Sequence, residues 1–95
     1  MSRYFKRHWD ETPGEGLTGS WGTSIFYFET DEDYNVLRQI QIFQNGQILK
    51  YDNNLVNDQF GGLADQQLDK NDFANYSIDD YEFNSTWATI QRKII

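Results

Sequence analysis

Four stretches in the first half of the chain predict β-strands, because two of them alternate hydrophobic and polar residues, one is rich in aromatic and β-branched residues, and the last follows a hairpin signal. In the first stretch Phe5 and Trp9 share one face, while Lys6 and His8 share the other. The four stretches are residues 3–9, 21–30, 36–44 and 47–51. Short links between them predict an antiparallel meander.

Polar and glycine-rich segments separate these strands. Residues 10–20, with one proline and three glycines, predict a mobile loop. The acidic cluster at residues 31–33 predicts a chain reversal. Asn45 and Gly46 predict a two-residue hairpin of type I′, because both tolerate a positive φ.

The third predicted strand has two unlike faces. Val36, Ile40 and Ile42 alternate with more polar neighbours, so they form its apolar face. After residue 52 the strand pattern stops, and the Asn- and Gly-rich residues 53–62 predict an irregular stretch.

Two helical segments are predicted near the C-terminus. Asp69 predicts the N-cap of a single turn ending at Phe73, and Ser77 begins a similar capping pattern before a longer helix. From Ile78 onward, apolar residues recur at helical spacing, with acidic residues in the first turn and basic residues in the last. These apolar and basic positions are Phe83, Trp87, Ile90, Ile94, Arg92 and Lys93. We expect about four turns.

These elements predict a single α+β domain over residues 1–95. Its length and 38% hydrophobic content suit one core. The expected architecture is a four-stranded antiparallel β-sheet with the C-terminal helix packed on one face and a short helical turn before it.

The charge is strongly negative and unevenly placed. The net charge is −7, and all fifteen acidic but only three of the eight basic residues lie at positions 10–91, which leaves −12 there. Such a surplus favours a basic partner and repels nucleic acid and anionic membranes. The chain has no cysteine and no long apolar run, and its N-terminus is charged, so we expect a cytoplasmic protein.

Motifs for metal or cofactor binding are incomplete. Asp31, Asp33 and Asn35 match the first, third and fifth positions of a calcium loop, but Val36 and Ile42 stand where glycine and glutamate are required. We therefore interpret this segment as a solvated turn. We expect no metal and no cofactor, since no phosphate-binding glycine motif is present either.

Catalysis is the weakest of the interpretations considered. His8 is the only histidine, with Asp10, Ser20 and Ser24 as nominal triad partners, but no nucleophile-elbow motif is present. We do not predict an enzyme. The basic and aromatic residues at positions 3–9 are of the types found in nucleic-acid-binding sites. We nevertheless expect them to pair with carboxylates elsewhere in the chain.

The chain resembles a family of small acidic bacterial proteins of unassigned function. Its members share an acidic turn, a V-R-K-V-E-V-F-x-D-G hairpin and an I-S-x-E-E-F-E-x-x-W helix. Residues 28–46, and residues 63–68 through to 78–83 and Trp87, resemble this family, so the resemblance spans most of residues 3–87. Here Leu37 precedes Arg38, Asn45 replaces Asp, and the Ile-Ser order is inverted. The genes of such proteins are often associated with polymorphic or contact-dependent toxin systems. The resemblance therefore implies an immunity protein that binds and neutralises a cognate toxin domain.

Charge and exposure predict which residues would bind that partner. Turns and the irregular stretch are expected to expose five acids with two aromatic anchors, a combination found in interfaces. These residues are Asp31, Glu32, Asp33, Tyr34, Tyr51, Asp52 and Asp58. The partner would be a basic nuclease. The alternatives are a DNA-mimicking regulator of a DNA-binding protein and a small enzyme that uses His8.

Overall fold

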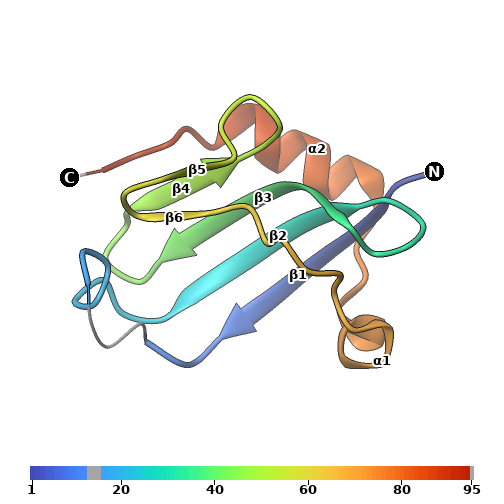
Figure 1. The fold of residues 1–95 in the computed structure, drawn as a ribbon, viewed down its shortest axis with the longest axis horizontal. Coiled ribbons are helices and arrows are strands. Elements are labelled where there is room, and N and C mark those ends of the chain that lie inside the picture. Colours follow the sequence, from blue (N-terminus) through green and yellow to red (C-terminus); the bar gives the residue numbers. More distant parts are fainter. Residues whose placement is uncertain (13–15, 95) are drawn as a thin grey trace.

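The computed structural model describes residues 1–12 and 16–94 and is built on a four-stranded antiparallel sheet (Figure 1). The strands pair in chain order, which confirms the predicted meander. They are β1 (Arg3–Trp9), β2 (Ser24–Thr30), β3 (Val36–Phe43) and β4 (Ile48–Tyr51). Part of the loop expected at residues 10–20, namely residues 13–15, lies outside the described residues.

The β3–β4 hairpin is confirmed, but the predicted two-residue turn is wrong. Gly46 takes a φ of 91°, whereas Asn45 is outside the positive-φ region. The N–H of Gly46 donates to the carbonyl of Phe43 at 2.9 Å, and the N–H of Phe43 donates to the carbonyl of Gln47 at 2.9 Å. The loop therefore has three residues, with glycine at its left-handed position.

A β-bulge divides the apolar residues of β3 between the two faces. Glu29 pairs with Arg38 but Thr30 pairs with Val36, so the register shifts by one residue. As a result Val36 packs with Phe5 on one face, while Ile40 and Ile42 lie on the other. The prediction that these three residues share a face is wrong for Val36.

The second half of the chain contains a small hairpin and three short helical elements. These are β5 (Asn57–Asp58), β6 (Gly61–Gly62), α1 (Lys70–Phe73), the 3-10 helix η1 (Ala74–Tyr76) and α2 (Asp80–Thr89). The Asp69 carboxylate caps α1 as predicted, but α2 is capped by Asp79 instead of Ser77.

Helix α2 is shorter than the sequence predicts. Its 10 residues end where Ile90 becomes extended, with ψ of 122°. The backbone of Lys93 then exchanges two hydrogen bonds with Ile48, at 2.8 and 2.9 Å, along the edge of β4. Arg92 and Lys93 therefore follow the helix, and their predicted place in its last turn is wrong.

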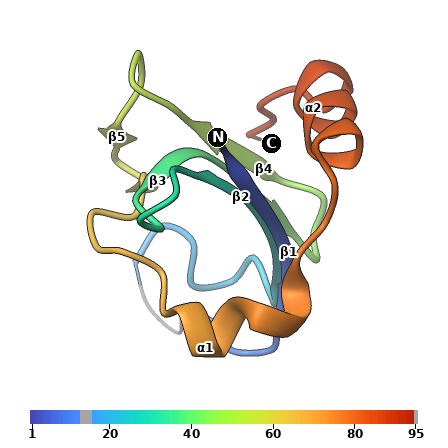
Figure 2. The same ribbon diagram turned by 90° about the vertical axis from the view of Figure 1, so that its right-hand side faces the viewer.

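The two faces of the sheet have different covers (Figure 2). Helix α2 packs on one face, here called the α2 face, with Phe83 against Tyr27 and Ile40. The other face, called the groove face, carries two further clusters beneath residues 60–68 and α1. Their buried members are Phe5, Phe28, Val36 and Phe73 in one, and Trp21, Phe43, Leu49 and Tyr51 in the other.

Candidate functional site

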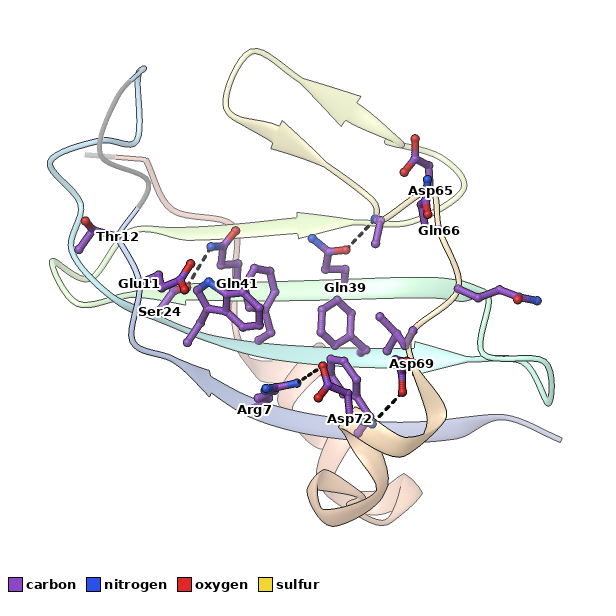
Figure 3. A pocket seen from close by; sticks show the side chains of 17 residues that line it. Arg7, Glu11, Thr12, Ser24, Gln39, Gln41, Asp65, Gln66, Asp69 and Asp72 are labelled. Atoms are coloured by element: carbon purple, nitrogen blue, oxygen red, sulfur yellow. Dashed lines mark hydrogen bonds and ion pairs between the residues drawn. The ribbon is translucent and has the colours of Figure 1, made fainter.

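The groove face is incompletely covered, and the opening forms a groove of about 740 Å³ (Figure 3). Side chains of β1, β2 and β3 form its floor, and residues 64–69 together with α1 form its walls. Figure 3 shows Glu11 near one end and Asp65 near the other, with Gln39 and Gln41 between them. This groove is the candidate site.

Aromatic rings form the apolar part of the floor. Phe26 and Phe28 follow each other on the same face of β2, and their rings stack with centroids 5.2 Å apart and planes 7° apart. Trp9 of β1 meets Phe26 edge-on at 6.1 Å and is 39% exposed. Ring surface that a partner could cover is therefore present.

Two glutamines of β3 supply the amides of the floor. Gln39 is buried, donates to the carbonyl of Gly62 at 3.1 Å and accepts from the N–H of Ala64 at 2.9 Å. These bonds attach the groove wall to the sheet. Gln41 donates through Nε2 to the Ser24 hydroxyl at 3.0 Å, and within residues 1–12 and 16–94 its Oε1 accepts no hydrogen bond.

The rim of the groove is acidic. Four carboxylates line it against one cation, Arg7, which leaves a net charge of −3. Nη1 of Arg7 lies 3.6 Å from Oδ2 of Asp72. The Arg7 guanidinium packs over the rings of Phe73 and Tyr76, at 4.9 and 4.7 Å from their centroids. The rim carboxylates are those of Glu11, Asp65, Asp69 and Asp72. In the described part of the chain, Glu11 and Asp65 form no ion pair.

Four of the seven predicted binding residues lie together in the β2–β3 turn, residues 31–34. Hydrogen bonds from the side chain and N–H of Asn35 and from the N–H of Asp33 lower the pKa of Asp31. Glu32 lies 3.3 Å from the N-terminal amine. Only part of this turn's charge is therefore available to a partner.

Tyr34 is held in that turn by its neighbours. Its backbone φ is 69°, in the left-handed region that residues other than glycine rarely adopt. Its ring lies 5.7 Å from that of Phe5 and 5.0 Å from the guanidinium of Arg3. The N–H of Leu68 donates to its carbonyl at 2.9 Å. Tyr34 is thus half-buried and mainly contacts its own fold.

The other three predicted residues lie in a separate region and are engaged there. Tyr51 is 1% exposed, so its expected exposure is wrong. Its hydroxyl donates to Asp58 at 2.8 Å, and Arg92 also contacts Asp58. The Asp52 carboxylate accepts from the N–H groups of Asn54 and Leu55. Tyr51 and Asp58 therefore stabilise the fold.

Burial raises the pKa of Asp58, but hydrogen bonds from Phe60, Tyr51 and Arg92 outweigh it, and the pKa lies below its ordinary value. Burial and the neighbouring Asp58 raise the pKa of Tyr51. Both directions fit a carboxylate that stays charged beside a neutral phenol.

The sheet separates the nominal triad residues. His8 pairs with Ile25 and Trp9 pairs with Ser24, so the His8 and Ser24 side chains lie on opposite faces. His8 contacts Asp10 at 2.9 Å on the exposed surface. No group of three or more His, Cys, Asp or Glu side chains suited to a metal occurs among residues 1–12 and 16–94. None of the helices in these ranges is long and apolar enough to cross a membrane.

Comparisons with protein-family models, curated proteins and solved structures give no significant match. The site is therefore interpreted from its own residues. The groove was not predicted from the sequence, although the alternation of Phe26 and Phe28 with Ile25 and Tyr27 could have indicated a second aromatic face.

Proposed function

We propose that this protein is an immunity protein that binds and neutralises a basic toxin domain in the cytoplasm of the cell that makes both. One observation carries the proposal: an open groove combines an aromatic floor with four rim carboxylates. Aromatic anchors provide desolvated contact area, and surrounding charges raise the association rate and orient the partner.

The charge of the whole chain supports the same kind of partner. With a net charge of −7, it attracts proteins that carry positive surface, as nucleases do to hold a phosphate backbone. An inhibitor bound to that surface would exclude the nucleic acid.

The groove is a better candidate for the interface than the β2–β3 turn. Glu11 and Asp65 lack ion-pair partners among the described residues, whereas Asp31 is hydrogen-bonded within the turn and Glu32 contacts the N-terminus. The groove also offers ring surface. We therefore assign the partner-binding role to the groove, with the turn as a secondary contact.

The proposal is tested by calorimetric titration with the purified product of the neighbouring gene at two salt concentrations. We expect nanomolar binding that weakens with salt, together with loss of that product's nuclease activity. Two double variants, each of which removes two negative charges, locate the interface. Glu11→Gln with Asp65→Asn alters the groove, and Glu32→Gln with Asp33→Asn alters the turn.

The groove variant is expected to weaken binding by about tenfold, whereas the turn variant changes it less. No binding by the neighbouring product would refute the immunity role. Binding only to a DNA-binding protein, in competition with duplex DNA, would instead identify a DNA mimic.

A further inference from the structure

We infer that the groove receives an arginine side chain of the basic partner, which stacks on the aromatic floor and donates hydrogen bonds to Gln41 and the rim carboxylates. This inference rests on the proposed function and adds the chemistry of the ligand. It follows from the shape of the floor, its unused hydrogen-bonding atoms and its charge.

The floor suits a flat cation. The rings of Phe26 and Phe28 stack on each other, and Phe28 is buried, so the apolar surface open to a ligand is that of the half-buried Phe26 and of Trp9 beside it. A guanidinium is planar, stacks on aromatic faces and is less strongly hydrated than an ammonium. The same fold already packs one guanidinium this way, because Arg7 lies over Phe73 at 4.9 Å.

Of the amide atoms of the two floor glutamines, the one without a hydrogen bond in the described residues is an acceptor, whereas the buried Nη1 of Arg7 is a donor without a hydrogen bond. Gln41 lines the groove and uses Nε2 as a donor to Ser24, and its Oε1 accepts no hydrogen bond from residues 1–12 or 16–94. Gln39 uses both of its amide atoms on the groove wall. A ligand that meets Gln41 must therefore bring donors, and arginine has five.

The charges select the same ligand. Asp72 is already paired with Arg7, but Glu11 and Asp65 are exposed and available. Arg7 pairs with Phe26, which pairs with Gln41, so two strand spacings of ~4.8 Å separate Arg7 from Gln41. An incoming guanidinium at Gln41 would thus lie two strands from the backbone of Arg7, whose own guanidinium packs over Trp9 at 5.3 Å and Phe73 at 4.9 Å, and an anionic ligand would meet the acidic rim.

The test is an NMR titration of the full chain at low salt with N-acetyl-arginine methylamide. Its neutral citrulline analogue is the matched control ligand. We expect the arginine probe to shift the Trp9 indole N–H, the Gln41 side-chain amide and the backbone amides of residues 64–68. The citrulline analogue should bind at least about threefold more weakly, because it lacks the cation–π and charge contributions.

Variants on the protein side separate the groove from general acidity. Glu11→Gln with Asp65→Asn should weaken probe binding by about tenfold, and Asp33→Asn by less than about twofold. Both changes affect exposed side chains, so folding should be retained. Equal shifts with citrulline, or shifts confined to the β2–β3 turn, would overturn the inference.

Failure of this inference can be distinguished from failure of the proposed function. If the neighbouring product binds but the arginine probe does not perturb the groove, the inference fails and the immunity role stands. If the probe binds in the groove and the neighbouring product does not bind, the assignment of an arginine site stands without that role.

Discussion

On the α2 face, the cations of the sheet are bound to the helix. Arg38 contacts Glu29 at 2.5 Å and Asn84 at 2.7 Å. Lys50 donates to the carbonyls of Trp87 and Ile90, at 2.7 and 3.0 Å, at the C-terminal end of α2. On the groove face the rim carries four carboxylates with a single cation. The same four strands therefore present a neutralised face and an acidic one.

The difference follows from what covers each face. A helix leaves its last carbonyls without intrahelical donors, and Lys50 donates to one of them, that of Trp87, and to the carbonyl of Ile90 just after the helix. Burial of Lys50 lowers its pKa. The wall of the groove is instead an irregular segment attached by the side chain of Gln39. It covers only part of the aromatic floor.

Core truncation should produce the largest difference between the faces. Phe83 is 0% exposed beneath α2, whereas Phe26 borders the open groove. We expect Phe83→Ala to lower the free energy of unfolding by about 3–5 kcal/mol and Phe26→Ala by less than half as much. Urea unfolding measures both. Equal losses would show that the groove face is as tightly packed as the α2 face.

The two glutamines of β3 provide a matched test within the groove face. Gln39→Ala leaves Gly62 and Ala64 without their side-chain partners, so we expect a loss of about 2 kcal/mol in unfolding free energy. Gln41→Ala removes a single bond to Ser24 and should cost about 0.5–1 kcal/mol. Hydrogen exchange at Ala64 should increase only in the Gln39 variant. A reversed order would mean that the wall is held by other contacts.

The acid stability of the fold should depend on Asp58. Its pKa is lowered in the folded protein, so its contribution is present above the ordinary value of 3.8 and is lost as the pH falls through the folded pKa. Asp58→Asn should lower the unfolding free energy by about 1–2 kcal/mol at pH 7. The difference from the parent should narrow below pH 3.8, as measured by urea unfolding across pH. The control is Asp33→Asn, and an Asp58→Asn difference that stays constant with pH would contradict the assignment.

The strand order, the hairpin position and the capping of α1 could be predicted because each depends on local sequence. Alternation specifies a strand, and Asp69 binds N–H groups only two and three residues away. The end of α2 could not be predicted in this way. It depends on the pairing of Lys93 with Ile48, which are 45 residues apart. The helical spacing continues past the point where that pairing stops the helix.

The candidate site was harder to predict for the same reason. Tyr51 ends a strand and precedes an acid, which is typical of an exposed anchor, yet it is buried in a cluster with Trp21 and Phe60. The groove depends on where residues 64–69 leave the sheet uncovered, and that segment is held by the two hydrogen bonds of Gln39 and by the bond from Leu68 to the Tyr34 carbonyl. Neither contact has a local sequence signal.

The smallest expected effect concerns Tyr81, on the outer surface of α2. It is 78% exposed between Asp80 and Glu82, so this surface also combines an aromatic ring with acids. Tyr81→Ala should change the unfolding free energy by less than about 0.5 kcal/mol, because the ring makes no aromatic contact with the described core and alanine favours helix. Circular dichroism and urea unfolding measure this.

The two faces can be compared directly by measuring the affinity of the Tyr81→Ala variant for the basic partner. If the groove is the interface, Tyr81→Ala leaves that affinity unchanged, whereas Trp9→Ala lowers it by about tenfold through the loss of a groove anchor. A tenfold loss with Tyr81→Ala and none with Trp9→Ala would place the partner on α2. The cations that neutralise the α2 face lie beneath α2. The acids on the outer surface of α2, and not the groove, would then bind the partner.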